Sequence, residues 1–345
     1  MRGFTWKNQS KFTDPGAAGA VIDELPADLA ALREASSQLV FHYRADGDWA
    51  ENGVPAERAG EIDTRYADAM FALLLSRGEP TLARKRLPPD RVVGCCRDAT
   101  LLFVSLARHK GIPARMRVGF AAYFHPGLLI DHVVAEAWDE AAGRWRLIDG
   151  EMNSDWTPEV HGHPVDWMDL ADDQFVTGPR AWQAARAGTS DPERHLTAPG
   201  LDAPELRGWP LLARHVIHDL VALNKTEMLV WDAWGMQLGI GPGPVTGQDA
   251  VLLDEICAHL AGPGVSPTSS PHSPTGPSCA SRPPSPASTL AAAPAQGHPP
   301  PMTPTQPPGG TGASLFVLVA HRPAPHNRGS KRGKDSENTH SDPAK

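Results

Sequence analysis

Apolar residues recur at helical spacing in the first part of the chain. Residues 22–41 predict a helix with Pro26 near its start and apolar side chains at Leu25, Leu29, Leu32 and Leu39. Residues 62–76 predict a second helix, which ends at Gly78 and Pro80. We therefore expect residues 1–90 to form an N-terminal helical part of the fold.

A third helical segment, residues 97–110, is apolar on nearly every side. Its apolar positions are Leu101, Leu102, Phe103, Val104 and Leu106. A helix without a polar face is typical of a protein interior, so we expect a buried central helix here. Gly111 and Pro113 end it, because glycine is favoured just beyond a helix and proline cannot continue one.

Three strands are expected after this helix, at residues 114–123, 132–138 and 145–148. The last two are separated only by a short segment ending in Gly143, which predicts a hairpin. A buried helix that leads into an antiparallel sheet is an α+β layout. Residues 210–235 are again helical in pattern, and we expect them to pack on the same core or to form a small annex.

The composition changes abruptly near Ala261. All ten tryptophans precede this point, and proline, serine and glycine dominate afterwards. Such a segment buries too little apolar surface to offset its chain entropy, so residues 263–345 are expected to be a disordered tail. A separate hypothesis is that the tail is an out-of-frame reading of a GC-rich gene.

Charge and cysteine content narrow the possible partners and the compartment. A net charge of −8 gives no electrostatic reason to expect nucleic acid or an anionic membrane surface as partner. No apolar run approaches the roughly 20 residues that span a bilayer. Four cysteines in 345 residues do not make a secreted disulfide framework, and no signal segment is visible, so we expect a cytoplasmic protein.

Cys96 stands at the predicted start of the central helix. Free backbone N–H groups and the helix dipole favour an anion there, so we expect a lowered thiol pKa and a reactive thiolate. A thiolate needs a proton partner, for which His132 is a candidate. Asp149, after the following strand, can orient that imidazole. On paired antiparallel strands, His132 and Asp149 can lie side by side.

Three blocks of sequence together resemble the transglutaminase-like superfamily, and imply a bacterial member with a papain-like core. They are Gly94-Cys-Cys-Arg-Asp98 with Gly111-Ile-Pro-Ala-Arg115, then Asp131-His-Val-Val-Ala-Glu-Ala-Trp138, then Gly143-Arg-Trp-Arg-Leu-Ile-Asp-Gly150. The resemblance covers residues 91–152, which we expect to be the catalytic core, with residues 153–262 as a C-terminal helical extension. It implies that Cys96 is the nucleophile, His132 the base or ion-pair partner, and Asp149 the orienting acid, with Trp145 as a core aromatic.

The resemblance implies an enzyme that transfers acyl groups or hydrolyses amides of a protein or peptide through a Cys96 thioester. Water as acceptor gives a peptidase or deamidase, and an amine gives a transglutaminase. No cofactor is expected. The alternative is a catalytically silent binding or scaffold module, and a redox pair of Cys95 with Cys96 is a third hypothesis. Two departures from the family pattern, Val134 in place of Trp and Gly150-Glu151 in place of Pro-Thr, leave the triad intact but can alter the cleft.

Several other polar residues have alternative interpretations. Cys95 is expected to be core filler, and Asp98 to complement the helix dipole. Glu136 either lines the cleft or is a buried paired carboxylate. The sequence predicts no metal site, because His161-Gly-His163 with nearby aspartates is a weak signal. His215, His218 and Asp219 are expected to be core or surface residues, and Trp49, Asn52 and Arg65 are guesses for an oxyanion donor.

Overall fold

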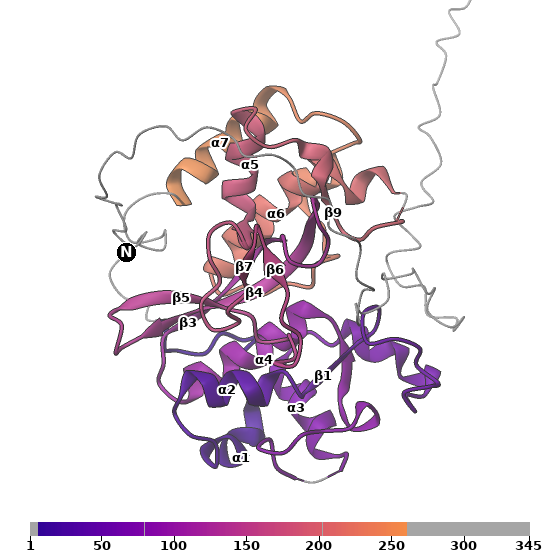
Figure 1. The fold of residues 1–345 in the computed structure, drawn as a ribbon, viewed down its shortest axis with the longest axis vertical. Coiled ribbons are helices and arrows are strands. Elements are labelled where there is room, and N and C mark those ends of the chain that lie inside the picture. Colours follow the sequence, from indigo (N-terminus) through magenta and orange to yellow (C-terminus); the bar gives the residue numbers. More distant parts are fainter. Residues whose placement is uncertain (1–5, 79, 202, 261–345) are drawn as a thin grey trace, which may run out of the picture. The chain divides into compact units, whose positions relative to one another are not determined.

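The central sheet runs across the middle of the computed structural model (Figure 1). The structure describes residues 6–78, 80–201 and 203–260, all within one compact unit, Met1–Gly312. The predicted disordered tail, residues 263–345, lies outside the described residues. None of the described helices is long and apolar enough to cross a bilayer.

The main sheet has the strand order β5-β4-β3-β8, and all neighbouring pairs on this path are antiparallel. Its strands are β3 (Ala114–Ala121), β4 (Leu129–Asp139), β5 (Arg144–Ile148) and β8 (Phe175–Thr177), and β9 (His195–Leu196) adds a short parallel pairing to the start of β4. The predicted hairpin is confirmed as β4–β5. Register places His132 opposite Gly119 and pairs Ala135 with Ile148, so His132 and the residue after β5 approach each other.

The predicted central helix is confirmed as α4 (Cys96–His109). Every residue from Cys96 to Arg108 is buried, and the helix packs on β3 and β4. The Thr100 hydroxyl donates a hydrogen bond to the Val133 carbonyl at 2.8 Å, which ties the helix to the strand that carries His132. Gly111 has φ +74°, the left-handed conformation that glycine adopts freely after a helix.

The N-terminal part is less regular than expected. It contains η1 (Gly16–Ala18), α1 (Gly19–Asp23), α2 (Leu29–Ser36), β1 (Val40–His42), η2 (Ala56–Asp63), α3 (Ala67–Leu75), η3 (Pro88–Asp90) and β2 (Val92–Gly94). The single helix predicted over 22–41 is wrong, because the chain turns at Pro26 and a new helix starts after Asp28. The Asp28 side chain accepts a hydrogen bond from the Ala31 N–H at 2.9 Å and so caps α2.

Two short strands, β1 and β2, pair in parallel, and β2 ends just before α4. The register sets His42 opposite Gly94, two residues before Cys96. Sequence periodicity did not predict either strand, because each has only three residues. Their pairing brings a histidine from far upstream to the start of the central helix.

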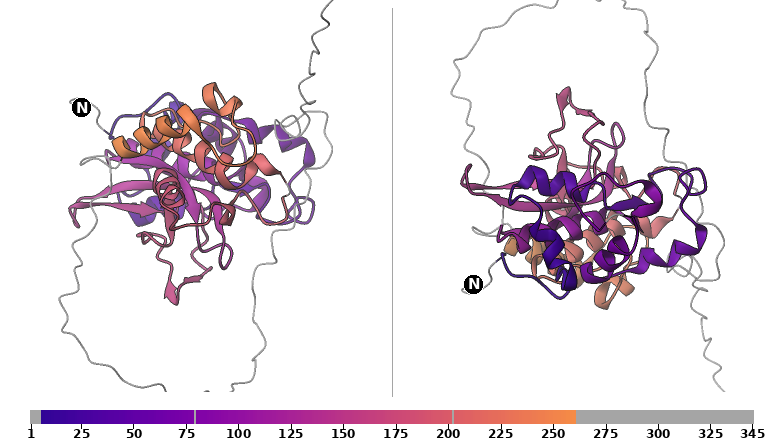
Figure 2. Two further views of the ribbon diagram at one scale, coloured as in Figure 1. Left: turned by 90° about the horizontal axis from the view of Figure 1, so that it is seen from above. Right: turned by 90° about the horizontal axis from the view of Figure 1, so that it is seen from below.

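The C-terminal part covers the sheet with further helices. Its elements are β6 (Glu159–Val160), β7 (His163–Pro164), α5 (Gly178–Arg186), η4 (Pro192–Arg194), η5 (Pro204–Leu206), α6 (Gly208–Leu223), η6 (Gly235–Leu238) and α7 (Gly247–Leu260). Helices α5 and α6 contact β3, while α7 packs on α5 and α6. The β6–β7 hairpin extends on the side away from α7 (Figure 2). The helical prediction for 210–235 holds only as far as Leu223.

Buried charges link the sheet to α6. Glu136 is fully buried between Arg115, at 2.5 Å, and Arg117, at 3.1 Å. Arg117 also forms a two-pronged ion pair with Asp219 on α6, at 2.9 and 3.0 Å. Glu136 is therefore a buried paired carboxylate and does not line the cleft. The predicted core position of Trp145 needs correction, because its side chain is half-buried and lies 4.5 Å below the Arg115 guanidinium.

Candidate active site

Cys96 is the first residue of α4, directly after the turn from β2. The side chain of Asp98 folds back over this turn and accepts a hydrogen bond from the Cys95 N–H at 2.9 Å. A Cβ on Gly94 would lie 2.5 Å from Oδ2 of Asp98, so the turn requires glycine here. Arg97, fully buried, pairs with Asp98 at 2.9 Å and donates to the carbonyls of Arg65 and Glu227. Asp98 thus anchors the helix start, and Arg97 ties it to two other segments.

The thiol of Cys96 is buried, with 8% of the residue exposed. A hydrogen bond with the adjacent Cys95 thiol and burial raise the pKa of Cys96 well above its ordinary value. The lowering of this pKa predicted from the helix N-terminus is therefore opposite to what the folded environment produces. The reason is that the hydrogen bond with Cys95 and the desolvation of a buried thiolate both favour the neutral thiol. The group at rest is a neutral thiol.

His132 and Asp149 lie side by side, as their strands suggested. Nε2 of His132 is 2.8 Å from Oδ2 of Asp149, and both side chains are almost completely buried. Oδ2 also accepts from the Tyr123 hydroxyl at 2.7 Å, while Oδ1 accepts from the backbone N–H groups of Glu151 and Met152. Burial alone would raise the pKa of Asp149, but His132 and these hydrogen bonds outweigh it and lower the pKa.

The ionised Asp149 determines which nitrogen of His132 carries the proton. A carboxylate can only accept, so the proton of a neutral imidazole lies on Nε2. Nδ1 then keeps its lone pair and faces the start of α4. Asp149 itself is placed by a hydrogen bond from its own N–H to the Trp167 carbonyl at 2.9 Å. The arrangement can accept a proton at Nδ1 and stabilise the resulting imidazolium.

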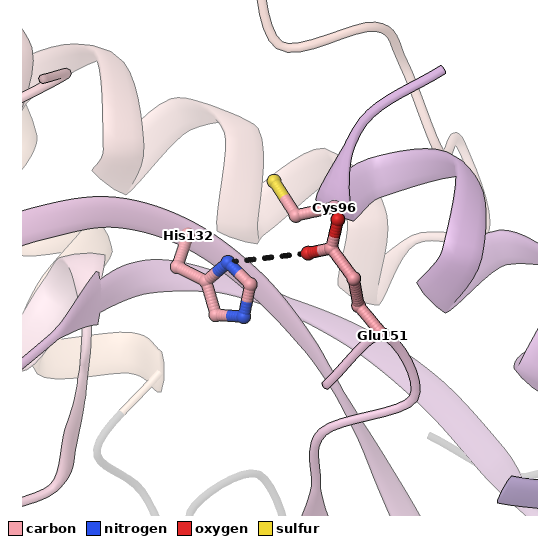
Figure 3. A group of neighbouring side chains, drawn as sticks. All are labelled: Cys96, His132 and Glu151. Carbon is pink, nitrogen blue, oxygen red and sulfur yellow. Dashed lines mark ion pairs between the residues drawn. The ribbon is translucent and has the colours of Figure 1, made fainter. Parts of the chain in front are cut away.

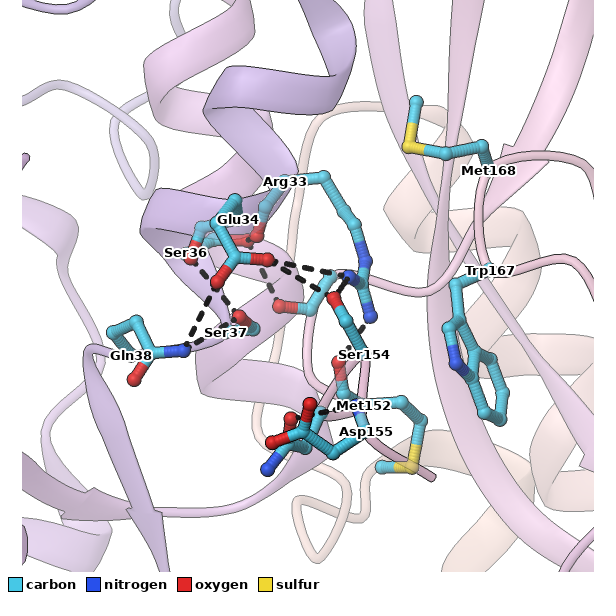
Figure 4. Close-up of polar contacts among 12 residues, drawn as sticks. Arg33, Glu34, Ser36, Ser37, Gln38, Met152, Ser154, Asp155, Trp167 and Met168 are labelled. Carbon is cyan, nitrogen blue, oxygen red and sulfur yellow. Dashed lines mark hydrogen bonds and ion pairs between the residues drawn. The ribbon is translucent and has the colours of Figure 1, made fainter. Parts of the chain in front are cut away.

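Helix α2 holds the loop that follows Asp149, as Figure 4 shows. Arg33 donates through Nε to the Asp149 carbonyl at 3.0 Å, and through its other nitrogens to the Met152 carbonyl and to Oγ of Ser154. Ser36 donates to the Gly150 carbonyl at 2.8 Å. The predicted N-terminal helical part thus has a direct structural role at the site.

Glu151 is a site residue that sequence reasoning did not single out. One ring nitrogen of His132, Sγ of Cys96 and a carboxylate oxygen of Glu151 all lie within 4.8 Å of one another (Figure 3). Oε2 is 4.0 Å from Nδ1 of His132, and Oε1 is 3.9 Å from Nε2 of His42. Burial, together with the negative charges of Asp149, Asp46 and Asp98, raises the pKa of Glu151 well above its ordinary value. The only sequence signal for Glu151 was the departure from Pro-Thr after the aspartate.

His42 is a second residue that only the structure brings to the site. Its Nδ1 accepts hydrogen bonds from the N–H groups of Arg44 and Ala45, both at 3.1 Å. The proton of the ring is therefore on Nε2, which faces Glu151. Burial lowers the pKa of His42 to about 3, so the ring stays neutral near pH 7.

The upstream residues guessed as oxyanion donors have other partners. Trp49 donates to the Tyr43 carbonyl at 3.1 Å, and Asn52 donates to the carbonyls of Asp46 and Asp48. Arg65 forms an ion pair with Asp232. All three side chains therefore make structural contacts, which do not support a role as oxyanion donors.

Aromatic side chains form a wall beside His132. The ring of Phe124 stands edge-on to the imidazole at 4.9 Å and stacks on Trp156 at 5.9 Å. Both are only half-buried, unlike the neighbouring Tyr123. The wall offers apolar contact surface next to the His132 imidazole.

The remaining histidine candidates lie apart from this cluster. His161 and His163 are exposed around the β6–β7 turn, and His161 faces Asp173 at 3.4 Å. His215 pairs with Asp131 at 2.8 Å, and His218 bonds to the Asp232 carbonyl at 2.9 Å. The last two are buried structural groups, one of the two interpretations that the sequence left open.

Comparison with known proteins finds one family that resembles part of the chain. Residues 55–150 match the model of the transglutaminase-like superfamily, a segment that includes Cys96, His132 and Asp149. A solved structure of a candidate cysteine protease from Cytophaga hutchinsonii aligns with 16% identity and a TM-score of 0.26, over 42% of this chain and 40% of that protein. The chain thus spans about two fifths of that protein's length. No curated protein matches the sequence significantly. The similarity to the transglutaminase-like superfamily thus covers residues 55–150, less than a third of the chain.

Proposed function

We propose that the protein is a thiol acyltransferase or amidase in which Cys96, His132 and Asp149 act as a catalytic triad. The observation that carries the proposal is the position of His132. Its Nε2 is bound to Asp149 at 2.8 Å, and its other ring nitrogen faces the cluster that contains the Cys96 thiol. An imidazole held in this way by a carboxylate is the arrangement that activates a neighbouring nucleophile.

The first half-reaction forms a thioester. Because Cys96 is a neutral thiol at rest, its proton passes to Nδ1 of His132 as the sulfur attacks an amide carbonyl. The new C–S bond gives a tetrahedral intermediate. His132 then returns the proton to the departing amine or ammonia as the C–N bond breaks. Asp149 stabilises the imidazolium that exists between these two transfers.

The oxyanion of the intermediate needs hydrogen-bond donors near Cys96. We assign one donor to Nε2–H of His42, whose proton position is set by the two backbone N–H groups that bind Nδ1. We assign the second donor to the backbone N–H of Cys96 at the start of α4. A neutral ring with a pKa of about 3 remains a hydrogen-bond donor throughout the neutral pH range.

The second half-reaction resolves the thioester. His132 removes a proton from water or from an amine, the new bond to carbon forms, and the C–S bond breaks to restore the thiol. Water gives a peptidase or deamidase, whereas an amine gives cross-linking. The substrate is an amide of a protein or peptide, and the wall of Phe124 and Trp156 would contact the residues next to the scissile amide.

The test compares the wild type with Cys96→Ala on a glutamine-rich peptide mixture, with and without an added primary amine, by mass spectrometry. We expect Cys96-dependent cleavage, a 1 Da gain from deamidation, or amine incorporation, and the product formed identifies the acceptor. Cys95→Ala is the matched control and should retain the reaction. Identical products from wild type and Cys96→Ala would overturn the proposal and leave a binding module.

A further inference from the structure

The carboxyl group of Glu151 makes no hydrogen bond within the described residues, although only 11% of its side chain is exposed. Its contacts are two histidine nitrogens at 3.9 and 4.0 Å and the nearby thiol of Cys96. In Figure 3 the carboxyl, the sulfur and the imidazole converge on one small region. Thiolate, imidazole and carboxylate are the donor types that bind Zn²⁺ in proteins.

We propose that Cys96, His132 and Glu151 form a binding site for Zn²⁺. The immediate surroundings of His132 favour this assignment. Metal-binding histidines almost always donate their second ring N–H to a carboxylate or carbonyl, which fixes the tautomer. Nε2 of His132 already donates to Asp149 at 2.8 Å, so the lone pair of Nδ1 is directed at the other two donors.

The spacing of the three donors is close to what zinc requires. Zinc bonds of about 2.0–2.3 Å in a tetrahedron hold ligand atoms roughly 3.3–3.8 Å apart. The donors here lie within 4.8 Å of one another, so the cluster must contract by about 1 Å. Glu151 can supply this movement, because its carboxyl has no hydrogen bond to break among the described residues and its side chain is long.

His42 does not complete the site as a fourth ligand. Its Nδ1 is occupied by two backbone N–H groups, and its Nε2 carries the proton. Three protein ligands with one open position remain, which is the ligand number of catalytic zinc sites. Binding would release the proton of the Cys96 thiol and any proton on the Glu151 carboxyl, since the metal binds thiolate and carboxylate.

Zinc bound at this position would inhibit the reaction of the Cys96 thiol. The metal would occupy both the sulfur lone pair and Nδ1, so neither attack nor proton transfer could take place. This inhibitory half of the inference rests on the proposed function, whereas the binding half does not. The departure from the family pattern at Glu151 would therefore give this chain a reversible metal-dependent control.

Binding is tested on full-length protein that has been freed of metal, by titrating Zn²⁺ against a chromogenic chelator. We expect one tight site, weakened at least about 10-fold by Glu151→Gln and lost in Cys96→Ala. The double variant His161→Ala/His163→Ala is the control for exposed histidines and should retain the site. Loss of the site in that variant, or wild-type affinity in Glu151→Gln, would overturn the proposal and indicate an adventitious ion only.

A second readout separates this inference from the catalytic one. Alkylation of Cys96 by iodoacetamide, followed by peptide mass, should slow at least about 10-fold with stoichiometric Zn²⁺ in the wild type but not in Glu151→Gln. Thiol-dependent turnover of each protein is compared with its own rate in the presence of a chelator, and Zn²⁺ should inhibit the wild type but not Glu151→Gln. Zinc protection without turnover would refute only the proposed function, and turnover insensitive to Zn²⁺ would refute only the zinc site.

Discussion

Replacing Asp149 by asparagine should prevent His132 from acting as a base, because it moves the imidazole proton from Nε2 to Nδ1. A carboxylate presents two acceptors, whereas an amide presents one acceptor and one donor. Oδ1 of Asp149 accepts from two backbone N–H groups, at 3.0 and 3.3 Å, and these can never become acceptors. In the Asp149→Asn variant the amide oxygen must therefore take the place of Oδ1, and the NH₂ group must face Tyr123 and His132.

The size of the effect on catalysis follows from Tyr123 and His132, the two groups that bind Oδ2 of Asp149. The Tyr123 hydroxyl can rotate to accept, but Nε2 of His132 can accept only by giving up its proton to Nδ1. A proton on Nδ1 prevents that nitrogen from accepting the proton of Cys96. Reversing the amide would leave the two partly buried backbone N–H groups of Glu151 and Met152 without an acceptor, at about 1–3 kcal/mol each. We therefore expect the loss of general-base catalysis, a decrease of about 10²–10⁴-fold in kcat/KM.

The assay is the rate of the Cys96-dependent reaction on the peptide mixture, with urea unfolding followed by tryptophan fluorescence as a check on stability. Tyr123→Phe is the matched control, because it removes one hydrogen bond from the same oxygen and should cost less than about 10-fold. A folded Asp149→Asn enzyme within about 10-fold of the wild type would refute the argument from the two backbone donors.

Three further predictions follow from the same contacts. His42→Ala should lower turnover about 10²-fold while leaving alkylation of Cys96 unchanged, since an oxyanion donor acts on the carbonyl; equal effects on both would count against that role. Arg33→Met should leave the Asp149 and Met152 carbonyls without this donor, and should lower both the urea midpoint and turnover; an unchanged midpoint would contradict it. Glu136→Gln should destabilise the fold by about 3–5 kcal/mol at pH 7, because two buried arginines lose their shared partner. Burial raises the pKa of Glu136, but Arg115 and Arg117 lower it more, so its pKa is lower in the folded than in the unfolded chain. The ionised carboxylate therefore stabilises the fold fully above the unfolded pKa of about 4.3, and this stabilisation is lost as the pH falls through the folded pKa. The urea midpoints of wild type and Glu136→Gln should accordingly converge in acid, and a constant gap would refute the linkage.

Local pattern was enough to identify the central helix and the hairpin. The run from Leu101 to Leu106 has no polar face, and Gly111 with Pro113 can only end a helix, so α4 follows from short-range chemistry. The hairpin follows from two alternating segments and a short turn at Gly143. The same local reasoning failed over residues 22–41, because the leucines keep helical spacing although the chain leaves the helix around Pro26 and starts a new one at Leu29.

The sequence by itself determined the order of the family blocks, the α+β class, and the adjacency of His132 and Asp149, because these depend on neighbouring strands with a short connection. Only the tertiary structure decided the state of the thiol and the identity of its other neighbours. The raised pKa of Cys96 comes from a hydrogen bond with the Cys95 thiol and from burial, and both depend on how the start of α4 packs in the folded chain. His42 reaches the site through a parallel pairing of three-residue strands, and Glu151 through a loop held by Arg33. Such long-range contacts depend on register and packing between distant segments, and these arise only when the whole chain has folded.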